Sequence, residues 1–196
     1  MNDFTIDYTF SLEDFKRVEE IEKDYFEEEN ISSAEEVMKW YEKNNKTSIG
    51  VRNSEGTIIA SINILPLKKN IYDEIYNNRI NEADIIYEDI EEFKDDMECF
   101  LYLSSISIDK NYKNNYILLS KLIKGTIDLL EELLERNIKI KEVLADAGTI
   151  YGRKICEKIL NMNFVTDTFH GTKIYNIEGK EFLEILRNIE NKMNKR

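Results

Sequence analysis

Apolar and polar residues follow two different periods along this chain, and the periods divide it into strands and helices. Alternation over residues 4–10 predicts a first strand, and comparable stretches predict further strands at 48–52, 57–65, 99–108, 142–145, 164–166 and 172–177. Capping sequences at Ser11 and Ser33 predict two helix starts. Apolar residues at helical spacing predict later helices at 116–136, 150–160 and 180–194. This mixed order predicts one α/β sheet covered by helices.

The strongest helical pattern is the one at 116–136. Its expected inward stripe consists of Leu119, Leu122, Ile123, Ile127, Leu130 and Leu134. Gly125 interrupts this helix at a cost of roughly 1 kcal/mol relative to alanine, which indicates a close packing contact there.

A long segment separates the third and fourth predicted strands. Pro66 is expected to end the third strand, and apolar residues then recur at near-helical spacing over about 67–95. The pattern predicts a helical insertion. Because no linker or internal repeat is visible and the length suits one core, residues 1–196 are expected to form a single domain.

Composition excludes several classes of protein. The formal net charge of −12 disfavours a nucleic-acid binder, which would need a basic face. No run approaches 18 apolar residues and the first ten residues do not resemble a signal peptide, so no membrane contact and a cytoplasmic location are expected. Two distant cysteines and one histidine are too few for a zinc site, so no metal is expected, and buried free thiols are favoured over a disulfide.

Charge is unevenly distributed along the chain. Residues 1–100 carry 26 acidic and 11 basic side chains, a net charge of −15, whereas residues 101–196 carry 13 and 16, a net charge of +3. Such asymmetry indicates either two surfaces with different partners or a first half whose acidic helices keep the protein soluble.

Two stretches carry a resemblance to a known family: LYLSSISIDKNYKNNYILLSKLIKG at 101–125 and KEVLADAGTIYGRKICEKILNMNF at 141–164. Each places a strand before an amphipathic helix, and the first includes a polar turn containing Tyr112 and Lys113. Together with the order of elements, these stretches resemble the GNAT N-acetyltransferase superfamily. The resemblance implies a mixed, largely antiparallel central sheet flanked by helices, with a helical insertion between the third and fourth strands.

The resemblance also implies a site for acetyl-CoA as cosubstrate. In the family, the turn that opens the helix after the central strand holds the pyrophosphate with backbone N–H groups and the helix dipole. The matching residues here are Lys113, Asn114, Asn115, Tyr116, Ile117 and Leu118. Tyr116 and Leu118 stand where the family has small residues, and their side chains could crowd the phosphates. An ordinary helix cap is the alternative for this turn. Peptide groups near Ile106 and Ile108 are also expected to meet the cofactor.

Candidate catalytic groups follow from the same resemblance. The tyrosine that serves many members as general acid is replaced by Glu157, next to Cys156, so Tyr151 is the nearest phenol that could protonate the departing thiolate. For a general base near the central strand, Glu98 is the candidate carboxylate, with the hydroxyls of Tyr102 and Ser104 as further candidates. His170 is given no role.

The implied function is acetyl-CoA-dependent transfer of an acetyl group directly to a small-molecule or protein amine. The acidic first half favours a cationic amine. One alternative is a catalytically inactive GNAT-fold module that binds a ligand or protein, and another is an interaction module that binds basic proteins. Residues 67–95 are expected to form a lid or wall of the acceptor site, with a peripheral helix or a homodimer contact as alternatives.

Overall fold

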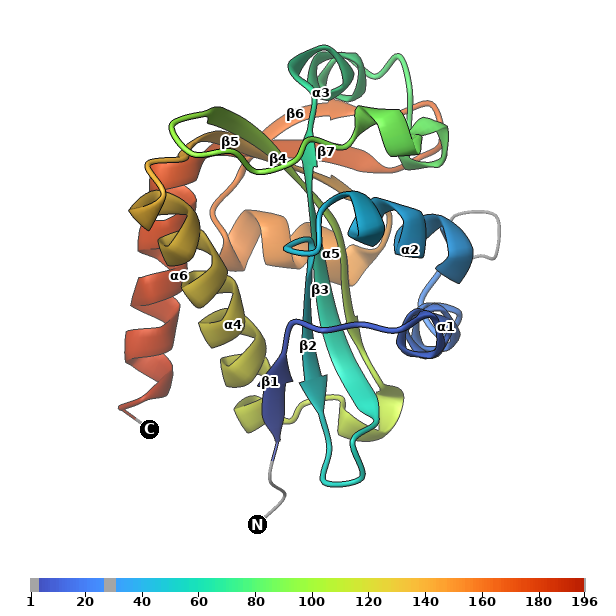
Figure 1. Ribbon diagram of the computed structural model, residues 1–196, viewed down its shortest axis with the longest axis vertical. Helices are drawn as coiled ribbons and strands as arrows, with labels where there is room; N and C mark the ends of the chain where they lie inside the picture. The colour runs from blue at the N-terminus through green and yellow to red at the C-terminus, as the bar shows by residue number, and fades with distance from the viewer. Residues whose placement is uncertain (1–3, 27–30, 196) are drawn as a thin grey trace.

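The computed structural model describes residues 4–26 and 31–195, and within these ranges seven strands form one sheet (Figure 1). The strands are β1 (Thr5–Asp7), β2 (Ser48–Arg52), β3 (Ile58–Leu67), β4 (Glu98–Ile108), β5 (Lys139–Ala147), β6 (Asn163–Asp167) and β7 (Lys173–Glu178). Their spatial order is β1-β2-β3-β4-β5-β7-β6. Only β4 and β5 run parallel; every other neighbouring pair is antiparallel. The predicted mixed, largely antiparallel sheet is confirmed.

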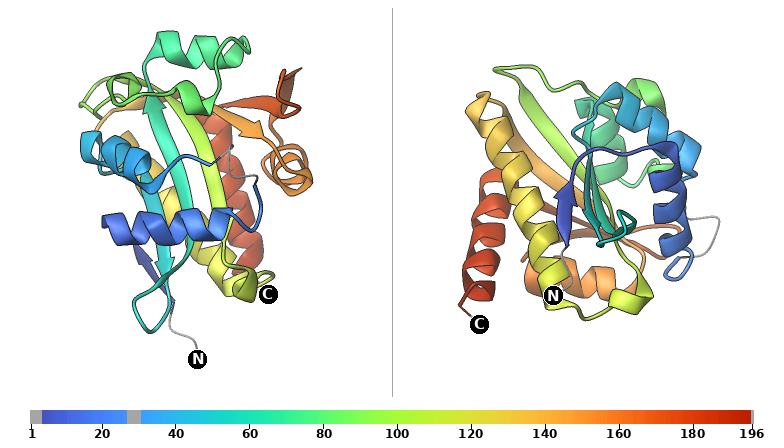
Figure 2. Two further views of the ribbon diagram at one scale, coloured as in Figure 1. Left: turned by 90° about the vertical axis from the view of Figure 1, so that its right-hand side faces the viewer. Right: turned by 60° about the horizontal axis from the view of Figure 1, so that its bottom comes forward.

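Helices cover both faces of this sheet (Figures 1 and 2). They are α1 (Leu12–Glu22), α2 (Ala34–Lys43), α3 (Lys69–Tyr76), α4 (Tyr116–Glu135), α5 (Ile150–Lys154) and α6 (Gly179–Met193), and a π-helical turn, η5 (Ile155–Ile159), continues α5. α1 and α2 lie on one face, and α4 and α6 pack on the other. The cores on the two faces are separate clusters of buried apolar residues.

Local sequence explains where α1, α2 and α4 begin. Ser11 and Ser33 form the predicted capping boxes, with Asp14 and Glu36 completing them. In α4, however, the predicted inward stripe is wrong at both ends, because Leu119 and Leu134 are exposed. Leu118 and Leu133 are buried instead, whereas Leu122, Ile123, Ile127 and Leu130 are buried as the pattern predicted.

Gly125 is a close packing contact, as its place in the helical pattern predicts. A Cβ atom on Gly125 would lie 2.5 Å from Ile49 Cγ2 of β2. The α4 backbone can therefore approach the sheet at this point only because the residue has no side chain.

Residues 67–95 form no long helix. α3 is followed by two short 3₁₀ turns, η2 (Glu82–Asp84) and η3 (Tyr87–Asp89), joined by irregular segments. Asn78 takes a left-handed conformation just after α3, and Asn81 caps η2, so asparagines end the helix that the apolar spacing predicted. The apolar residues still reach a core, because Ile85 and Ile90 are buried in the cluster that contains Tyr72 and Ile75.

Pro66 lies inside β3 and does not end it. The strand continues to Leu67, and Pro66 is paired with Leu101 of β4. The Pro66 carbonyl accepts a hydrogen bond from the Glu91 N–H, so its ring nitrogen also faces the insertion and not β4. No ladder hydrogen bond to β4 is lost, which is why proline is tolerated here.

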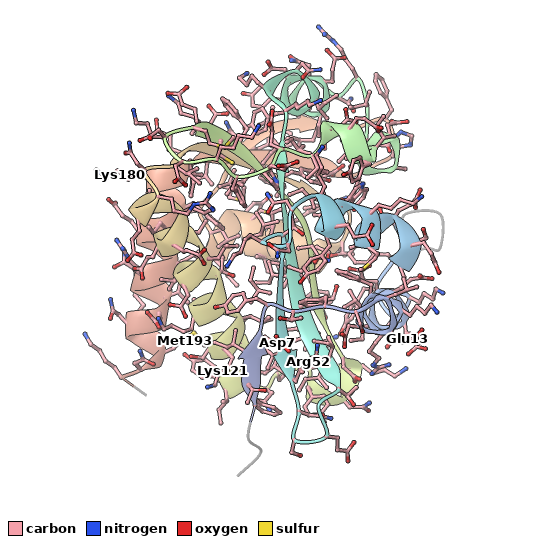
Figure 3. All side chains as sticks on the ribbon, viewed as in Figure 1. Asp7, Glu13, Arg52, Lys121, Lys180 and Met193 are labelled. Atoms are coloured by element: carbon pink, nitrogen blue, oxygen red, sulfur yellow. The ribbon has the colours of Figure 1, made fainter. Side chains whose placement is uncertain are left out.

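Arg52 ties the edge of the sheet to α1 (Figure 3). Its Nε donates to Asp7 Oδ2 of β1 at 2.7 Å, and one terminal nitrogen donates to Asp14 Oδ1 of α1 at 2.6 Å. Burial disfavours the charged form of Asp14, but hydrogen bonds from Arg52 and Ser11 outweigh burial and hold the pKa of Asp14 at about 2. These carboxylates are thus fully paired.

The sheet opens between its two parallel strands. The β4–β5 register runs from Glu98↔Lys139 to Leu103↔Ala145 and stops there, although β4 continues to Ile108 and β5 to Ala147. Beyond this point β4 pairs only with β3, while β5 pairs with β7. In Figure 2 (left), β6 and β7 turn away from the long strands β3 and β4. We call the unpaired region, between 104–108 and 146–147, the β4–β5 opening.

A β-bulge marks the start of the opening. Asn63 of β3 pairs with Ser105, but Ile64 pairs with Leu103, so Ser104 is an extra residue in β4. The bulge reverses the alternation of β4. Tyr102 before it, and Ser105 and Ser107 after it, therefore all lie on the face covered by α1, α2 and the insertion.

Candidate functional site

The β4–β5 opening presents peptide groups of β4. The Asp109 N–H donates to the Ile59 carbonyl at 2.9 Å, so Asp109 and Ile59 form a hydrogen-bonded pair of the antiparallel β3–β4 ladder. Hydrogen-bonded and non-hydrogen-bonded pairs alternate along such a ladder, so Ile106 and Ile108 belong to non-hydrogen-bonded pairs. Their N–H and C=O groups therefore point away from β3, toward the opening. The Tyr25 hydroxyl donates to the Ile108 carbonyl at 2.6 Å from that side. These are the two residues whose peptide groups the resemblance assigns to a cofactor.

The turn between β4 and α4 is closed by its own helix cap. The Asn115 side-chain oxygen accepts from the backbone N–H groups of Ile117 and Leu118 at 3.1 and 3.2 Å. Asn114, just before it, adopts a left-handed backbone conformation with φ of 74°. A phosphate bound by the amides of Ile117 and Leu118 would therefore have to displace the Asn115 oxygen.

Tyr116 and Leu118, which stand where the family has small residues, differ in their exposure. The Leu118 side chain is completely buried in the core beneath α4, so it does not crowd the surface of the turn. Tyr116 is 41% exposed and Ile117 is 60% exposed, so both lie at the rim of the turn. Only Tyr116 therefore adds bulk at a small-residue position on the surface.

Lys113 and Tyr151 are brought together by the fold. The Lys113 ammonium lies 4.8 Å from the centre of the Tyr151 ring and 6.0 Å from the centre of the Tyr25 ring. Tyr151 is 62% exposed in the first turn of α5, which begins at the Thr149 cap. A cation of the β4–α4 turn and a phenol of α5 thus share one side of the opening.

Cys156 and Glu157 of η5, which follow Tyr151 along the chain, do not offer a proton to the opening. Burial raises the pKa of the Cys156 thiol to about 12, so it stays neutral. Glu157 accepts a hydrogen bond from the buried Tyr175 hydroxyl at 2.7 Å. Among these residues of α5 and η5, Tyr151 alone offers an exposed phenol.

Glu98 is not brought together with the other candidates. It begins β4 opposite Lys139, and its carboxylate forms an exposed ion pair with Lys141 at 3.3 Å. The opening begins after Leu103, five residues along an extended strand, which is roughly 16 Å away. Glu98 therefore lies apart from the β4–β5 opening.

Glu82 of η2 reaches β4 at the bulge. Its carboxylate accepts hydrogen bonds from the Ser104 hydroxyl at 2.8 Å and from the Ser32 hydroxyl at 3.3 Å, and the Tyr102 hydroxyl also bonds to it. Burial raises the pKa of Glu82 to about 7, and the nearby negative charge of Glu22 adds to the shift. Both hydroxyls proposed from the sequence, those of Tyr102 and Ser104, thus contact a carboxylate that sequence analysis missed.

Glu22, the last residue of α1, occupies a second position along the same strand. Its carboxylate accepts from the Ser107 hydroxyl at 2.8 Å and is also bonded by Ser105. Burial raises the pKa of Glu22 above its usual value. Its position four residues after the buried Val18 placed it on the inward face of the predicted helix, so the sequence contained a signal for it.

Asp146 faces these groups from β5, one residue beyond the last β4–β5 pair. Burial raises its pKa, against opposing effects of a hydrogen bond from Thr172 and the charge of His170. Its Oδ1 atom is buried and has no hydrogen-bond partner within the described ranges. Burial raises the pKa of Tyr102, and the charges of Glu82 and Asp146 both add to the shift.

Glu22, Glu82 and Asp146 share one environment, and we call them the hydroxyl-bonded carboxylates. Each is held by serine, threonine or tyrosine hydroxyls, and each has a raised pKa for which burial is the main cause. In residues 4–26 and 31–195, no group of three His, Cys, Asp or Glu side chains is arranged to hold a metal ion. The same ranges contain no helix long and apolar enough to cross a membrane.

Comparison with known proteins bears on the fold. No protein-family model matches the sequence, and a search of curated proteins finds no match. Solved structures do match over most of their length. FeeM, an N-acyl amino acid synthase from uncultured soil microbes, is 10% identical, with 93% of this chain and 94% of that chain covered and a TM-score of 0.58.

Two further structures show the same likeness. A GNAT-family acetyltransferase from Staphylococcus aureus Mu50 is 12% identical, with 90% and 99% coverage and a TM-score of 0.53. Ard1 from Thermoplasma volcanium is 12% identical, with 88% and 94% coverage and a TM-score of 0.52. The chain therefore has the GNAT fold, and the resemblance noted in its sequence is confirmed at the level of the fold.

Proposed function

We propose that this protein is an N-acyltransferase that uses acetyl-CoA as cosubstrate and transfers the acetyl group directly to an amine. The observation that carries the proposal is the Glu82 carboxylate beside the β4–β5 opening, whose pKa of about 7 suits a general base at neutral pH. The GNAT fold, whose solved examples include proteins called acetyltransferases, supports the same reaction class.

The residues around the opening fit a coenzyme A thioester. The outward peptide groups of Ile106 and Ile108 offer hydrogen bonds to an extended amide-containing arm. Lys113 supplies a positive charge where the β4–α4 turn would meet the pyrophosphate. Asn115 would have to rotate away before the amides of Ile117 and Leu118 could bind a phosphate. The turn can therefore bind the pyrophosphate once the two hydrogen bonds of the Asn115 cap are broken.

The transfer requires a neutral amine and ends with a thiol. Glu82 takes a proton from the ammonium form of the acceptor, and the free amine attacks the thioester carbonyl. Collapse of the tetrahedral intermediate breaks the carbon–sulfur bond, and Tyr151 donates its phenolic proton to the departing thiolate. The attacking nitrogen gives up its second proton, which returns through water to the Tyr151 phenolate, and Glu82 releases its proton to water, so both groups are restored. Positioning of the two reactants supplies much of the rate.

The test is release of coenzyme A, together with cofactor binding. The wild-type protein is expected to bind acetyl-CoA in calorimetry and to release thiol when amines are added. Lys113→Glu is expected to weaken acetyl-CoA binding about tenfold, because it replaces attraction by repulsion at the pyrophosphate. The matched control is Lys68→Glu, an exposed lysine just before α3. Binding without thiol release from any primary amine would favour the inactive binding module and contradict the enzyme.

A further inference from the structure

We propose that the acceptor is a diamine or polyamine, with its reacting nitrogen at Glu82 and its distal ammonium at Glu22. This inference rests on the proposed acyltransferase function and specifies its substrate class. It is carried by the bonding partners of Glu22 and Glu82, by an unpartnered hydroxyl beside Glu22, and by the spacing of the two carboxylates along β4.

Neither carboxylate has a cationic partner among the described residues. Glu22 is bonded by Ser105 and Ser107, and Glu82 is bonded by Ser32, Ser104 and Tyr102. These hydroxyls donate hydrogen bonds but cannot neutralise a charge. Buried carboxylates are ordinarily paired with a cation, because an isolated buried charge is costly. A ligand that brings two ammonium groups would supply the missing charges.

An independent observation marks the Glu22 end as a ligand position. The Ser61 hydroxyl is completely buried and has no hydrogen-bond partner within residues 4–26 and 31–195. Ser61 of β3 is directly opposite Ser107 of β4, so the two side chains lie on the same face. Ser107 donates to Glu22, so the unpartnered Ser61 hydroxyl lies beside the serine that bonds that carboxylate. An ammonium group has three donors and can satisfy both.

The Glu82 end of the proposed acceptor site also has a buried acceptor without a partner, which is Asp146 Oδ1. Asp146 Oδ1 is buried without a partner and lies across the β4–β5 opening from Ser104, the hydroxyl that bonds Glu82. Within residues 4–26 and 31–195, Ser61 Oγ and Asp146 Oδ1 are the two buried side-chain atoms without a hydrogen-bond partner. One therefore lies at each end of the proposed acceptor site.

The two carboxylates are spaced for a short diamine. Ser104 and Ser107, which bond them, are three residues apart in an extended strand, which corresponds to roughly 10 Å. They also interact, because the charge of Glu22 raises the pKa of Glu82. A distal ammonium at Glu22 would cancel this repulsion, so a diamine would leave Glu82 deprotonated at lower pH than a monoamine would. The charge of Glu19 also raises the pKa of Glu22, and Ser32 and Tyr102 donate hydrogen bonds to Glu82.

The experiment compares putrescine with butylamine, which has the same carbon chain but one nitrogen. Wild-type protein is expected to use putrescine with a kcat/KM at least about tenfold above that for butylamine. Glu22→Gln keeps the size of the side chain but removes its charge, so the ratio of kcat/KM for putrescine to kcat/KM for butylamine is expected to fall to about one. Glu20→Gln, on the exposed side of the same helix, is the matched control and is expected to keep the preference.

Calorimetry of putrescine without acetyl-CoA separates this inference from the proposed function. Binding that is at least about tenfold weaker in Glu22→Gln than in wild type supports the acceptor site. If putrescine binds in this way but no amine releases thiol, the acyltransferase is contradicted and the diamine site stands. If wild type releases thiol with both amines equally well, or if Glu22→Gln retains the preference while remaining folded by circular dichroism, the diamine inference is overturned.

Discussion

Two groups of carboxylates lie at opposite ends of α1, and the protein treats them in opposite ways. At the start of the helix, Asp14 and its neighbour Asp7 are bonded to the Arg52 guanidinium, and the pKa of Asp14 falls to about 2. At its end, Glu22 is bonded only to hydroxyls, as is Glu82 beside it, and burial raises the pKa of both. The first group is neutralised within the fold; the second is left without a cation.

The presence or absence of a cationic partner indicates a structural role for Asp7 and Asp14 and agrees with the chemical role that we propose for Glu22 and Glu82. Paired carboxylates hold β1, β2 and α1 together and stay ionised at all physiological pH values. Hydroxyl-bonded carboxylates cost stability when ionised, and the pKa of about 7 at Glu82 suits the general base that we propose. Titratable groups with raised pKa values beside an opening in the sheet are a recognised mark of functional sites.

Glu82→Gln is expected to have the largest effect. Removing a general base lowers kcat by about 100- to 10,000-fold, because the acceptor ammonium loses its proton acceptor. Steady-state release of coenzyme A measures this change, and Glu88→Gln on the exposed surface of the insertion is the matched control. The melting temperature of Glu82→Gln should not fall, since no ion pair is lost. Retention of full activity would remove Glu82 from the mechanism.

Arg52→Ala is expected to act on stability and not on chemistry. It leaves Asp7 and Asp14 unpaired, and chemical denaturation should show a loss of about 2–3 kcal/mol in the free energy of unfolding. The kcat of the remaining folded protein should be unchanged. Arg79→Ala, which removes an exposed ion pair to Glu74, is the control and should cost less than about 1 kcal/mol. A fall in kcat with unchanged stability would reverse the assigned roles.

The two groups also predict opposite slopes of stability with pH. The pKa of Glu82 is about 7 in the folded state, above its usual 4.5, so its contribution is present below pH 4.5 and is lost as pH rises through 7. The pKa of Asp14 is about 2, below its usual 3.8, so its contribution is present above pH 3.8 and is lost as pH falls through 2. Denaturation between pH 5 and 8 should become less pH-dependent in Glu82→Gln, by on the order of 2 kcal/mol across that range.

Much of the fold was predictable from the sequence, because it depends on local signals. The order of strands and helices, both serine caps on α1 and α2, and the place of Gly125 all follow from spacing and cap chemistry. Residues 67–95 were less predictable, since asparagines at 78 and 81 overrode their apolar spacing. The resemblance in 101–164 pointed to the correct fold.

The candidate site was only partly predictable. Lys113 and Tyr151 meet in space, and Tyr102 and Ser104 lie at the opening, but Glu98 lies at the other end of β4. Glu82 was missed because its position depends on how the insertion folds back onto β4, a long-range contact that no local pattern encodes. The Asn115 cap was likewise visible only once its bonds to the α4 amides were known.

The most direct test of the account is a titration of the carboxyl groups by carbon-13 NMR, with Glu82 assigned by comparison with Glu82→Gln. We expect a midpoint near 7 for Glu82, caused by burial without a cation, and one near 2 for Asp14, caused by its hydrogen bonds from Arg52 and Ser11. A Glu82 midpoint near its usual 4.5 would contradict the claim that the β4–β5 opening holds a base poised for neutral pH.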